Sequence, residues 1–263
     1  MNNDIFMAKL KSATRLLIPI ISLLLLWQIL SSLGILNSQF LPSPLNVGRE
    51  LVDSLINQNL LVDILASLKR VVVGFLIAAV LGIGVGLFAG FNRTAANFVT
   101  PLVELFRPIP PIAWIPLAIL WFGLGDKPAY FLVFLGAFFP IFTNVFFGVT
   151  AVEETYKRAA YSLGATKRYF ITDILIPASL PHIFTGMRIG LGVGWIVVIT
   201  AELVGAQSGL GYMIQFNRLL LETPKVIVGM VVIGILGFLL NRLMAQLERK
   251  LVPWEKTKQT SHL

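Results

Sequence analysis

Arg107 lies in an apolar stretch that prolines interrupt. The stretch covers residues 104–116, and its prolines are Pro108, Pro110, Pro111 and Pro116. Proline lacks a backbone donor and moves the residue before it away from helical angles, so no straight helix is expected here. Pro110 and Pro111 suit the start of a second half-helix, whose exposed amides carry partial positive charge. With Arg107 beside these amides, the chemistry that the stretch predicts is the binding of an anion.

A simpler arrangement of the same residues is open as well. The helix would begin near Pro110, and Arg107 would be an ordinary cation outside it, paired with Glu104 three positions earlier. The two arrangements differ in whether irregular backbone lies within the membrane. Only the first arrangement places it there. Irregular backbone within a membrane is stable only where protein buries it or a water-filled cavity reaches it, as in transporters with broken helices.

A second polar pattern lies on one face of the apolar run 183–206. Arg188, Trp195 and Glu202 follow one another at intervals of seven residues. At about 100° per residue, this spacing keeps the three side chains within roughly 40° of one line along a helix. Charges in membrane helices usually face a bundle interior or a transport pathway. Because Arg188 and Glu202 lie close to the ends of the run, snorkelling of both charges to the membrane surface is the alternative.

The polar segment 152–182 has the pattern of a docking element. It predicts two helical stretches, 153–163 and 166–174, that meet at Gly164, and Pro177 and Pro181 are expected to end the second stretch. A helix–glycine–helix segment held against a membrane suits the binding of a cytoplasmic protein.

Composition indicates which elements must position these residues. Of the 263 residues, 56% are hydrophobic and 13% are charged, and the mean hydropathy is +0.83. Soluble domains carry about 25% charge. The apolar residues form runs of about twenty, the length that crosses a hydrocarbon core of roughly 30 Å as a helix. We therefore expect an all-α integral membrane protein with about six spans, at 16–36, 71–91, 102–124, 130–151, 183–206 and 226–243.

The charges between the runs predict the orientation. If the N-terminus is cytoplasmic, thirteen Lys and Arg residues lie inside and six lie outside, namely Arg49, Lys69, Arg70, Lys127, Arg218 and Lys225. This bias favours both termini in the cytoplasm and explains the net charge of +8 without a nucleic-acid partner. The run 16–36 is too long for the core of a signal peptide and lacks a small-residue cleavage site, so it is expected to be a true span.

Two further patterns concern packing. The segment 37–70 continues after Leu41-Pro42-Ser43-Pro44 with an amphipathic pattern, which favours a helix on the outer membrane surface over a plain loop. Small residues recur every four positions in two spans, which lets another helix approach closely. These residues are Gly74, Ala78, Gly82, Gly86 and Gly90 in one span and Gly186, Gly190 and Gly194 in the other.

An enzyme is not expected. The carboxylates form no paired motif, His182 and His262 are the only imidazoles, and cysteine is absent, so neither acid–base catalysis nor a metal centre is favoured. No Gly-x-x-x-x-Gly-Lys-Ser/Thr phosphate loop occurs, so any ATP that the protein uses must be bound by another polypeptide.

The segment 152–182 resembles the signature loop of permease subunits in bacterial ATP-binding cassette (ABC) importers. That signature has Glu-Ala-Ala, a glycine shortly afterwards, and later Ile-x-Leu-Pro. The corresponding residues here are Arg158-Ala159-Ala160, Gly164 and Ile174-Leu175-Ile176-Pro177. Two positions depart from the signature, since Arg158 reverses the charge of the glutamate and Ile176 replaces the leucine.

The resemblance covers about residues 41–254 and extends to one branch of the family, which handles nitrate, sulfonates including taurine, and bicarbonate. It rests on short motifs spread along the chain, at residues 41–44, 107–111, 121–125, 139–140, 201–202, 209–212 and 251–254. The individual anion within this branch is left open.

The resemblance implies a type I importer permease fold with a cytoplasmic coupling loop. That loop would lie in a cleft of an ABC ATPase subunit and contact it through Arg158, Ala159, Ala160, Tyr161, Leu163, Gly164, Ala165, Ile174 and Pro177. Two such ATPases, which bind ATP and magnesium, would drive two permease chains, expected as a homodimer, between inward-open and outward-open states. This chain itself would hold no cofactor and no metal.

The resemblance also implies a solute-binding protein outside the membrane, received by the segments 37–70 and 207–225. Candidates for the substrate pathway, within a bilayer whose lipid surrounds the chain, are Arg107, Trp114, Phe139, Asn144, Arg188, Trp195 and Glu202.

Three parts are expected in the inner membrane of a bacterium. They are an N-terminal span with the outer segment (1–63), the permease core with its coupling loop 152–182 (64–245), and a cytoplasmic tail (246–263). The alternative from another class is a non-transporting scaffold or signalling subunit. It leaves the interrupted third span and the segment 152–182, which we call the docking loop, without a role.

Overall fold

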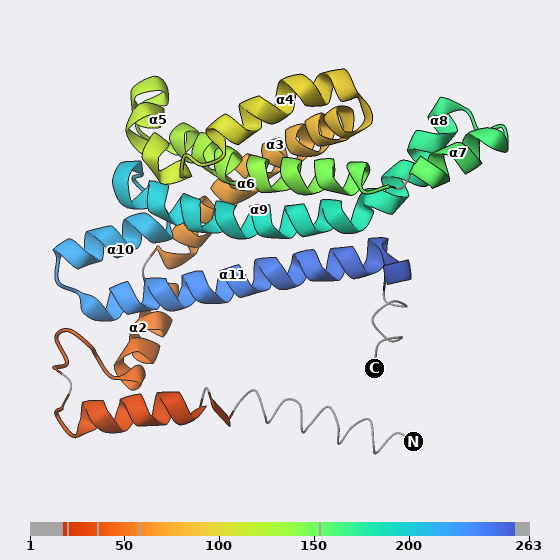
Figure 1. Ribbon diagram of the computed structural model, residues 1–263. Helices are drawn as coiled ribbons and strands as arrows, with labels where there is room; N and C mark the ends of the chain where they lie inside the picture. Colours follow the sequence, from red (N-terminus) through yellow and green to blue (C-terminus); the bar gives the residue numbers. More distant parts are fainter. Residues whose placement is uncertain (1–17, 20, 36, 58, 153, 256–263) are drawn as a thin grey trace, which may run out of the picture. The chain divides into compact units, whose positions relative to one another are not determined.

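The computed structural model describes residues 18–19, 21–35, 37–57, 59–152 and 154–255 (Figure 1). Within these ranges every regular element is a helix, which confirms the all-α prediction. The elements are α2 (Pro44–Ile56), α3 (Leu60–Phe91), α4 (Arg93–Phe106), η1 (Pro111–Trp114), α5 (Ile115–Phe122), α6 (Asp126–Thr150), α7 (Glu154–Ser162), α8 (Lys167–Tyr169), η2 (Phe170–Leu175), α9 (Ile176–Gly205), α10 (Leu210–Leu219), α11 (Thr223–Leu251) and η3 (Pro253–Glu255).

Several of these helices can cross a membrane. In the described part of the chain, four are long and apolar enough, namely α3, α6, the continuous helix Lys167–Gly205 and α11. The bent pair formed by α4 and Pro111–Phe122 is a fifth candidate. The predicted span 16–36 falls partly outside the described residues, and its described part holds a shorter apolar helix, Ile21–Ser32. A multi-pass membrane protein is therefore confirmed, and six spans stays a prediction.

The chain divides into two compact units. The first combines the described residues up to Leu61 with Met213–Val232. In it, the hydroxyl of Ser43 caps α2 by accepting from the backbone N–H of Asn46, which confirms a helix in the outer segment. The second unit combines Val62–Tyr212 with the chain from Ile233 onward and contains every predicted site residue. The predicted three-part division of the chain is not tested by these units and stays a prediction.

The central helix of the second unit is α6, which lies between α3 and α9 (Figure 1). A Cβ atom built on Gly86 of α3 would lie 2.8 Å from Cβ of Val145, and one built on Gly186 of α9 would lie 2.8 Å from Cβ of Asn144. The other stripe glycines meet α6 in the same way, with Gly74, Gly82 and Gly90 facing Val133, Ile141 and Val149, and Gly190 and Gly194 facing Ala137 and Val133. The predicted role of the small residues in helix packing is confirmed.

The third apolar run is broken, as its prolines predict. α4 ends at Phe106, and η1 begins at Pro111 after an extended Pro110. The axes of α4 and Pro111–Phe122 differ by 83°. Prolines at 108, 110 and 111 remove three of the four backbone donors of residues 108–111, so the helix cannot continue and the chain turns.

The prediction that Pro177 and Pro181 end a helix is wrong. Both prolines lie within one continuous helix, Lys167–Gly205, which includes the π-helical turn η2. The wider π turn directly before Pro177 gives its ring room beside the preceding carbonyls. Nearby, the Ser179 hydroxyl donates to the carbonyl of Leu175 at 2.7 Å. Prolines are tolerated in membrane helices where a local change of helix type re-satisfies the freed backbone groups, and η2 is such a change.

The start of α3 also differs from its prediction. The run was expected from residue 71, but the helix begins at Leu60, so Asp63, Ser67 and Arg70 belong to α3 and not to an outer loop. These residues had been predicted to belong to the outer segment 37–70, for which a helix on the membrane surface was favoured over a plain loop. The contacts described below show that these polar side chains are partnered within the protein.

Candidate functional site

Arg107 lies at the break of the third span. It caps the C-terminus of α4, where its backbone N–H donates to the carbonyl of Val103 at 2.8 Å, and its side chain is exposed. Among the ion pairs of the described residues, none joins Arg107 to Glu104. A helical segment does begin near Pro110, since η1 starts at Pro111, and α4 precedes the break with fourteen helical residues, so where the span begins stays a prediction. Arg107 is therefore a cation beside irregular backbone between two apolar helices.

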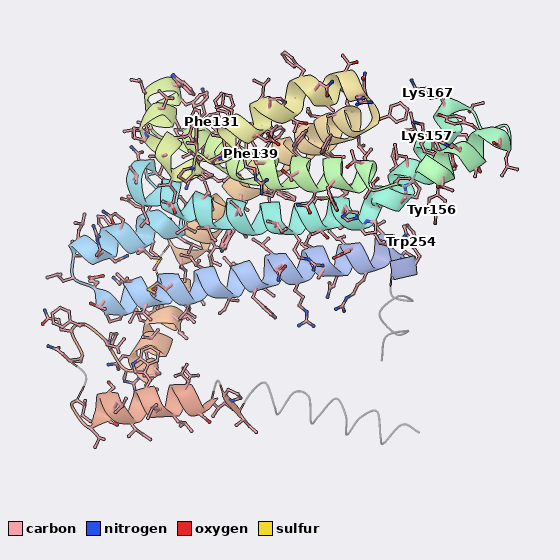
Figure 2. All side chains as sticks on the ribbon, viewed as in Figure 1. Phe131, Phe139, Tyr156, Lys157, Lys167 and Trp254 are labelled. Atoms are coloured by element: carbon pink, nitrogen blue, oxygen red, sulfur yellow. The ribbon has the colours of Figure 1, made fainter. Side chains whose placement is uncertain are left out.

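A cavity of about 400 Å³ lies between α4, η1, α5 and α6. We call it the aromatic cavity. Two predicted pathway residues, Trp114 and Phe139, line it. The full lining consists of Val99, Leu102, Val103, Phe106, Trp114, Trp121, Phe131, Phe134, Leu135, Phe138 and Phe139. Figure 2 labels Phe131 and Phe139 on α6.

The rings around the aromatic cavity support one another. Phe131 of α6 meets Trp114, Trp121 and Phe122 with centroid distances of 6.5, 5.9 and 5.4 Å. Such tilted and edge-on contacts between aromatic rings are favourable beyond the area that they bury. They hold η1 and α5 against α6 although the chain turns sharply before η1.

Asn144 is placed differently from these residues. It is half-buried on α6, its side-chain amide donates to the carbonyl of Pro140 at 2.8 Å, and its Cβ atom contacts Gly186. The structure thus brings Asn144 to the contact between α6 and α9. Its predicted place in the pathway stays a prediction.

The polar face of α9 makes contacts within the chain. Arg188 forms an ion pair with Glu248 of α11. Trp195 donates its indole N–H to the carbonyl of Ile233 at 3.2 Å and packs on Gly237. The periodicity correctly predicts that the three side chains share a face, and part of this face meets α11. A pathway role for these residues stays a prediction.

Glu202, the third residue of this face, belongs to a buried network. Glu202 is 1% exposed, and its carboxylate accepts a hydrogen bond from Arg70 Nη1 at 2.8 Å, while Arg70 is 2% exposed. The same carboxylate accepts hydrogen bonds from the hydroxyl of Ser67 at 2.8 Å and from the backbone N–H of Gly211 at 2.9 Å. Arg70 Nε also donates to Asp126 Oδ1 at 2.8 Å. We call Ser67, Arg70, Asp126 and Glu202 the Arg70–Glu202 network.

Arg70 and Asp63 also bind the short connection between α9 and α10. Arg70 donates to the carbonyl of Ser208 at 2.6 Å and to its hydroxyl at 3.0 Å, and the N–H of Gly209 donates to Asp63 at 2.7 Å. Gly209 has φ +107, and a Cβ atom built on it would lie 2.5 Å from the carboxyl carbon of Glu202, so only glycine fits. Buried charges are stable when each is paired and hydrogen-bonded in this way.

Sequence reasoning missed the network as a unit. Arg70 had been counted among the cations outside the membrane, and of the network only Glu202 was singled out as a candidate. One signal could have shown it, because Asp63, Ser67 and Arg70 follow one another at intervals of four and three, which places three polar side chains on one face of a helix.

The docking loop has a rigid turn at its centre. Gly164 has φ +86, and its N–H donates to the carbonyl of Tyr161 at 3.0 Å. The N–H of Ala165 donates to the carbonyl of Ala160, also at 3.0 Å. This pair of hydrogen bonds ends α7 as a Schellman motif, in which glycine is favoured at the left-handed position. The expected tight turn at Gly164 is confirmed.

The predicted coupling residues divide into an inner and an outer group. Ala160 is buried in a cluster with Val149, Phe170 and Leu175, while Ala165 and Ile174 pack on its edge. Pro177 is half-buried at the start of α9. Leu163 is 88% exposed, Tyr161 is 40% exposed with its ring 5.7 Å from that of Phe170, and Arg158 and Ala159 are exposed. The outer group is therefore the part that is available to another protein.

Comparison with known proteins agrees with this architecture. The family described as "Binding-protein-dependent transport system inner membrane component" matches residues 82–253. A probable ABC transporter permease of Brucella abortus is 40% identical over 88% of this chain and 91% of its own length. The taurine transport system permease TauC of Escherichia coli is 37% identical over 88% and 86%. The nitrate import permease NrtB of Synechocystis is 35% identical over 91% and 89%.

A solved structure shows the same fold. A chain of the MetNI methionine ABC transporter, in an inward-facing conformation, superimposes with a TM-score of 0.64 and 23% identity. The match covers 73% of this chain and 96% of that chain. The chain described here belongs to the inner-membrane components of binding-protein-dependent transport systems, the permeases of ABC importers.

Proposed function

We propose that this chain forms the membrane pathway of an ABC importer for a small anion. A solute-binding protein delivers the anion, and ATP hydrolysis on separate ATPase subunits drives its passage. Named relatives carry taurine and nitrate, which are both transported as small polar solutes by permeases of this length and pattern. ATP and magnesium are bound by the ATPases, and this chain holds no cofactor.

The docking loop is the observation that carries the proposal. Four large side chains, those of Tyr156, Tyr161, Leu163 and Tyr169, are exposed within this short segment. In Figure 1 the loop helices α7 and α8 lie at one end of α9, past the end of the neighbouring α6. Exposed apolar side chains gathered on a rigid, non-membrane element favour contact with another protein. The signature residues around Gly164 support an ABC ATPase as that protein, with one ATPase for each of two permease chains.

The broken span supports the pathway. The segment from Arg107 to Pro110 is exposed and lacks regular hydrogen bonding, and Arg107 carries a charge. Neither irregular backbone nor an arginine is stable against lipid tails at membrane depth. A water-filled pathway or a second permease chain must therefore cover this face, which suits a homodimer with the pathway between its two chains.

The orientation follows from the position of the docking loop. If α7 and α8 are cytoplasmic, the Arg70–Glu202 network lies at the outer end of α9. We propose in addition that both chain termini lie in the cytoplasm. The segments 37–70 and 207–225 then face the solute-binding protein. This arrangement agrees with the excess of Lys and Arg in the inner segments.

The substitution Gly164→Asp tests the docking loop. A Cβ atom at Gly164 would meet no atom within 4 Å, and Asp enters the left-handed region more readily than most residues. The turn should therefore survive, while a carboxylate is added to the proposed contact with the ATPase. We expect the ATPase to be lost when the tagged chain is purified from its native membrane and its partners are identified by mass spectrometry.

Gly34→Asp is the matched control. Gly34 also has a positive φ, +73, with no atom within 4 Å of a built Cβ, but it lies far from the docking loop in the sequence. This variant should keep the ATPase in the same ratio as the parent chain. If Gly164→Asp keeps it too, the loop is not the docking element. If the parent chain purifies without any ATPase under mild conditions, the scaffold alternative replaces the importer.

A further inference from the structure

A second apolar pocket lies where α3 meets the helix that follows the docking turn at Gly164. It has a volume of about 200 Å³ and is lined by Leu87, Phe88, Phe91, Ile171, Leu175 and Ile176. We call it the η2 pocket, because Ile171 and Leu175 belong to that π turn. Small-molecule sites usually begin at roughly 300 Å³, and the η2 pocket is smaller. Phe88 is 61% exposed, so the pocket opens on the surface, and an occupant can extend out of it.

The η2 pocket lies at the end of an apolar run. α3 ends at Phe91, and the polar residues Asn92 and Arg93 follow directly. The end of such a run marks the depth at which hydrocarbon gives way to water, and in the proposed orientation this is the cytoplasmic surface. An empty apolar pocket forfeits dispersion contacts that an acyl chain beside α3 can supply. The position and the lining of the pocket therefore favour part of a lipid chain as its occupant.

A cation lies against one wall of the η2 pocket. Lys167 Nζ is 5.0 Å from the centroid of the Phe91 ring, and Phe91 lines the pocket. The Lys167 side chain, labelled in Figure 2, is exposed, and no ion pair between described residues includes it. An ammonium group has several N–H donors, and its contact with a ring face leaves some of them for an anion. The contact with Phe91 thus joins a positive charge to the apolar pocket.

The charges around Lys167 favour an anion as well. Arg168 directly follows Lys167, Arg93 begins α4, and both side chains are exposed. Asp173 is the acidic residue closest to Lys167 in the sequence. It lies two positions after Ile171, which places it on roughly the opposite side of the helix from the pocket lining. Lys and Arg residues at a cytoplasmic membrane surface attract anionic lipid headgroups.

We propose that the η2 pocket binds an anionic phospholipid of the cytoplasmic leaflet. One acyl chain occupies the pocket, and the phosphate headgroup binds Lys167. This inference goes beyond the proposed function, because it assigns a specific lipid site to the chain. It rests on the proposed function only for the side of the membrane.

The lipid site also connects the membrane to the docking loop. Three lining residues, Leu87, Phe91 and Ile171, pack against the buried cluster that contains Ala160 of the docking loop. Leu175 belongs to both the pocket lining and this cluster. A lipid chain in the pocket therefore stabilises the base of the docking loop through contacts that already exist.

The test is native mass spectrometry of the tagged chain together with the partners that copurify with it. The delipidated sample is titrated with phosphatidylglycerol or with phosphatidylcholine that carries the same acyl chains. We expect phosphatidylglycerol to bind at an about fivefold lower concentration, because one Lys near a membrane surface favours an anionic headgroup by about this factor. Glycerol 3-phosphate, which has the phosphate but no acyl chain, should not displace phosphatidylglycerol.

Substitutions of Lys167 test the headgroup contact. Lys167→Gln should weaken phosphatidylglycerol by about fivefold and leave phosphatidylcholine within about twofold of its parent value. Lys167→Arg keeps the positive charge and should keep the preference for phosphatidylglycerol. Lys127→Gln is the control, since Lys127 is an exposed lysine in the first turn of α6 and does not line the pocket. This control should keep the preference too.

Two alanine variants test the chain contact. Phe88 lines the pocket and is 61% exposed, so Phe88→Ala removes part of the wall with little disturbance of the fold. It should weaken both lipids by about threefold or more and leave their ratio unchanged, because dispersion contacts with the acyl chain are lost. Phe98→Ala is the matched control, since Phe98 is 73% exposed on α4 and is not part of the lining. It should weaken neither lipid.

Four outcomes would overturn the inference. Two are equal affinities of the parent chain for the two lipids and an unchanged preference in Lys167→Gln. A third is displacement of phosphatidylglycerol by glycerol 3-phosphate, which would show a site for free phosphate esters. The fourth is a disulfide between two copies of a Phe88→Cys variant in the native membrane, which would assign the pocket to a contact between permease chains; the chain has no other cysteine.

The failure of the inference differs from the failure of the proposed function. If an ATPase copurifies but the parent chain does not prefer phosphatidylglycerol, the importer stands and the lipid site is wrong. If no ATPase copurifies while the preference depends on Lys167, the lipid site stands and the proposed function fails.

Discussion

Replacing Gly86 by alanine tests the close packing between α3 and α6. The added Cβ atom would lie 2.8 Å from both Cβ and Cγ1 of Val145 and 3.2 Å from the carbonyl oxygen of Phe142. Contacts below 3.0 Å between carbon atoms are strongly repulsive, and all three of these atoms belong to a β-branched side chain or to backbone with little freedom to move. The helices must therefore separate, which also disturbs the contacts of the other stripe glycines.

The expected magnitude follows from two opposing effects. Extra atoms in a tightly packed core usually cost about 1–3 kcal/mol. Alanine in place of glycine stabilises a helix by up to about 1 kcal/mol. Gly84 separates the effects, since it lies in the same helix and a Cβ atom built on it meets nothing within 4 Å. The difference between Gly86→Ala and Gly84→Ala therefore reports the clash alone, and we expect roughly 1–3 kcal/mol.

The assay is thermal unfolding of the purified chain in one detergent, followed by tryptophan fluorescence. By the scaling of small proteins, the Gly86→Ala midpoint should lie about 2–12 °C below that of Gly84→Ala. Gly84→Ala should unfold no earlier than the parent chain. Equal midpoints for the two variants would show that α3 and α6 are not in backbone-to-side-chain contact at Gly86, and the described packing of the α3 stripe on α6 would be refuted.

Two further substitutions test the charged residues. Glu202→Gln removes the fully buried ion-pair partner of Arg70 and leaves it the partly exposed Asp126, which should destabilise the fold by up to about 3–5 kcal/mol in the same thermal assay. Lys69→Gln, which removes an exposed partner of Asp126, should change stability by less than about 1 kcal/mol, and similar effects of both would argue against a structural network. Arg107→Ala should reduce anion-stimulated ATP turnover of the complex to its basal rate while the ATPase still copurifies. Arg93→Ala, at the exposed start of the same helix, should leave the stimulation unchanged, and undiminished stimulation in Arg107→Ala would remove Arg107 from the pathway.

The features that local sequence decides could be predicted. The prolines at 108, 110 and 111 act on their own backbone, so the break in the third span and the start of a half-helix at Pro111 follow from residue type alone. Gly164 is similar, because the turn that it forms closes with hydrogen bonds to residues three and five positions earlier. The glycine stripes predict that a helix packs there. They do not indicate that one helix, α6, serves both stripes.

The features that depend on distant partners could not be predicted. Arg70 and Glu202 are separated by 132 positions, and nothing near either residue indicates the other. A charge between apolar runs therefore resembles an ordinary loop residue until the fold buries it. The aromatic cavity could not be predicted for the same reason. Trp114 and Phe139 were candidates as single aromatic residues, but the cavity that both line depends on how α4 and α5 pack on α6. The prediction that a helix ends at Pro177 was wrong for a different reason, because a π turn accommodates the proline ring.

The uninterrupted helix from Lys167 to Gly205 has a mechanical consequence. At 1.5 Å per residue its 39 residues form a rod of roughly 58 Å, almost twice the thickness of the hydrocarbon core. One end begins three residues after the turn at Gly164, and the other carries the carboxylate of Glu202. If the loop tilts, the helix therefore moves as one body, and its far end moves with it. The π turn close to the loop is the place where this helix could bend. Force generated by a cytoplasmic motor would arrive at Arg70 and Asp126 as displacement.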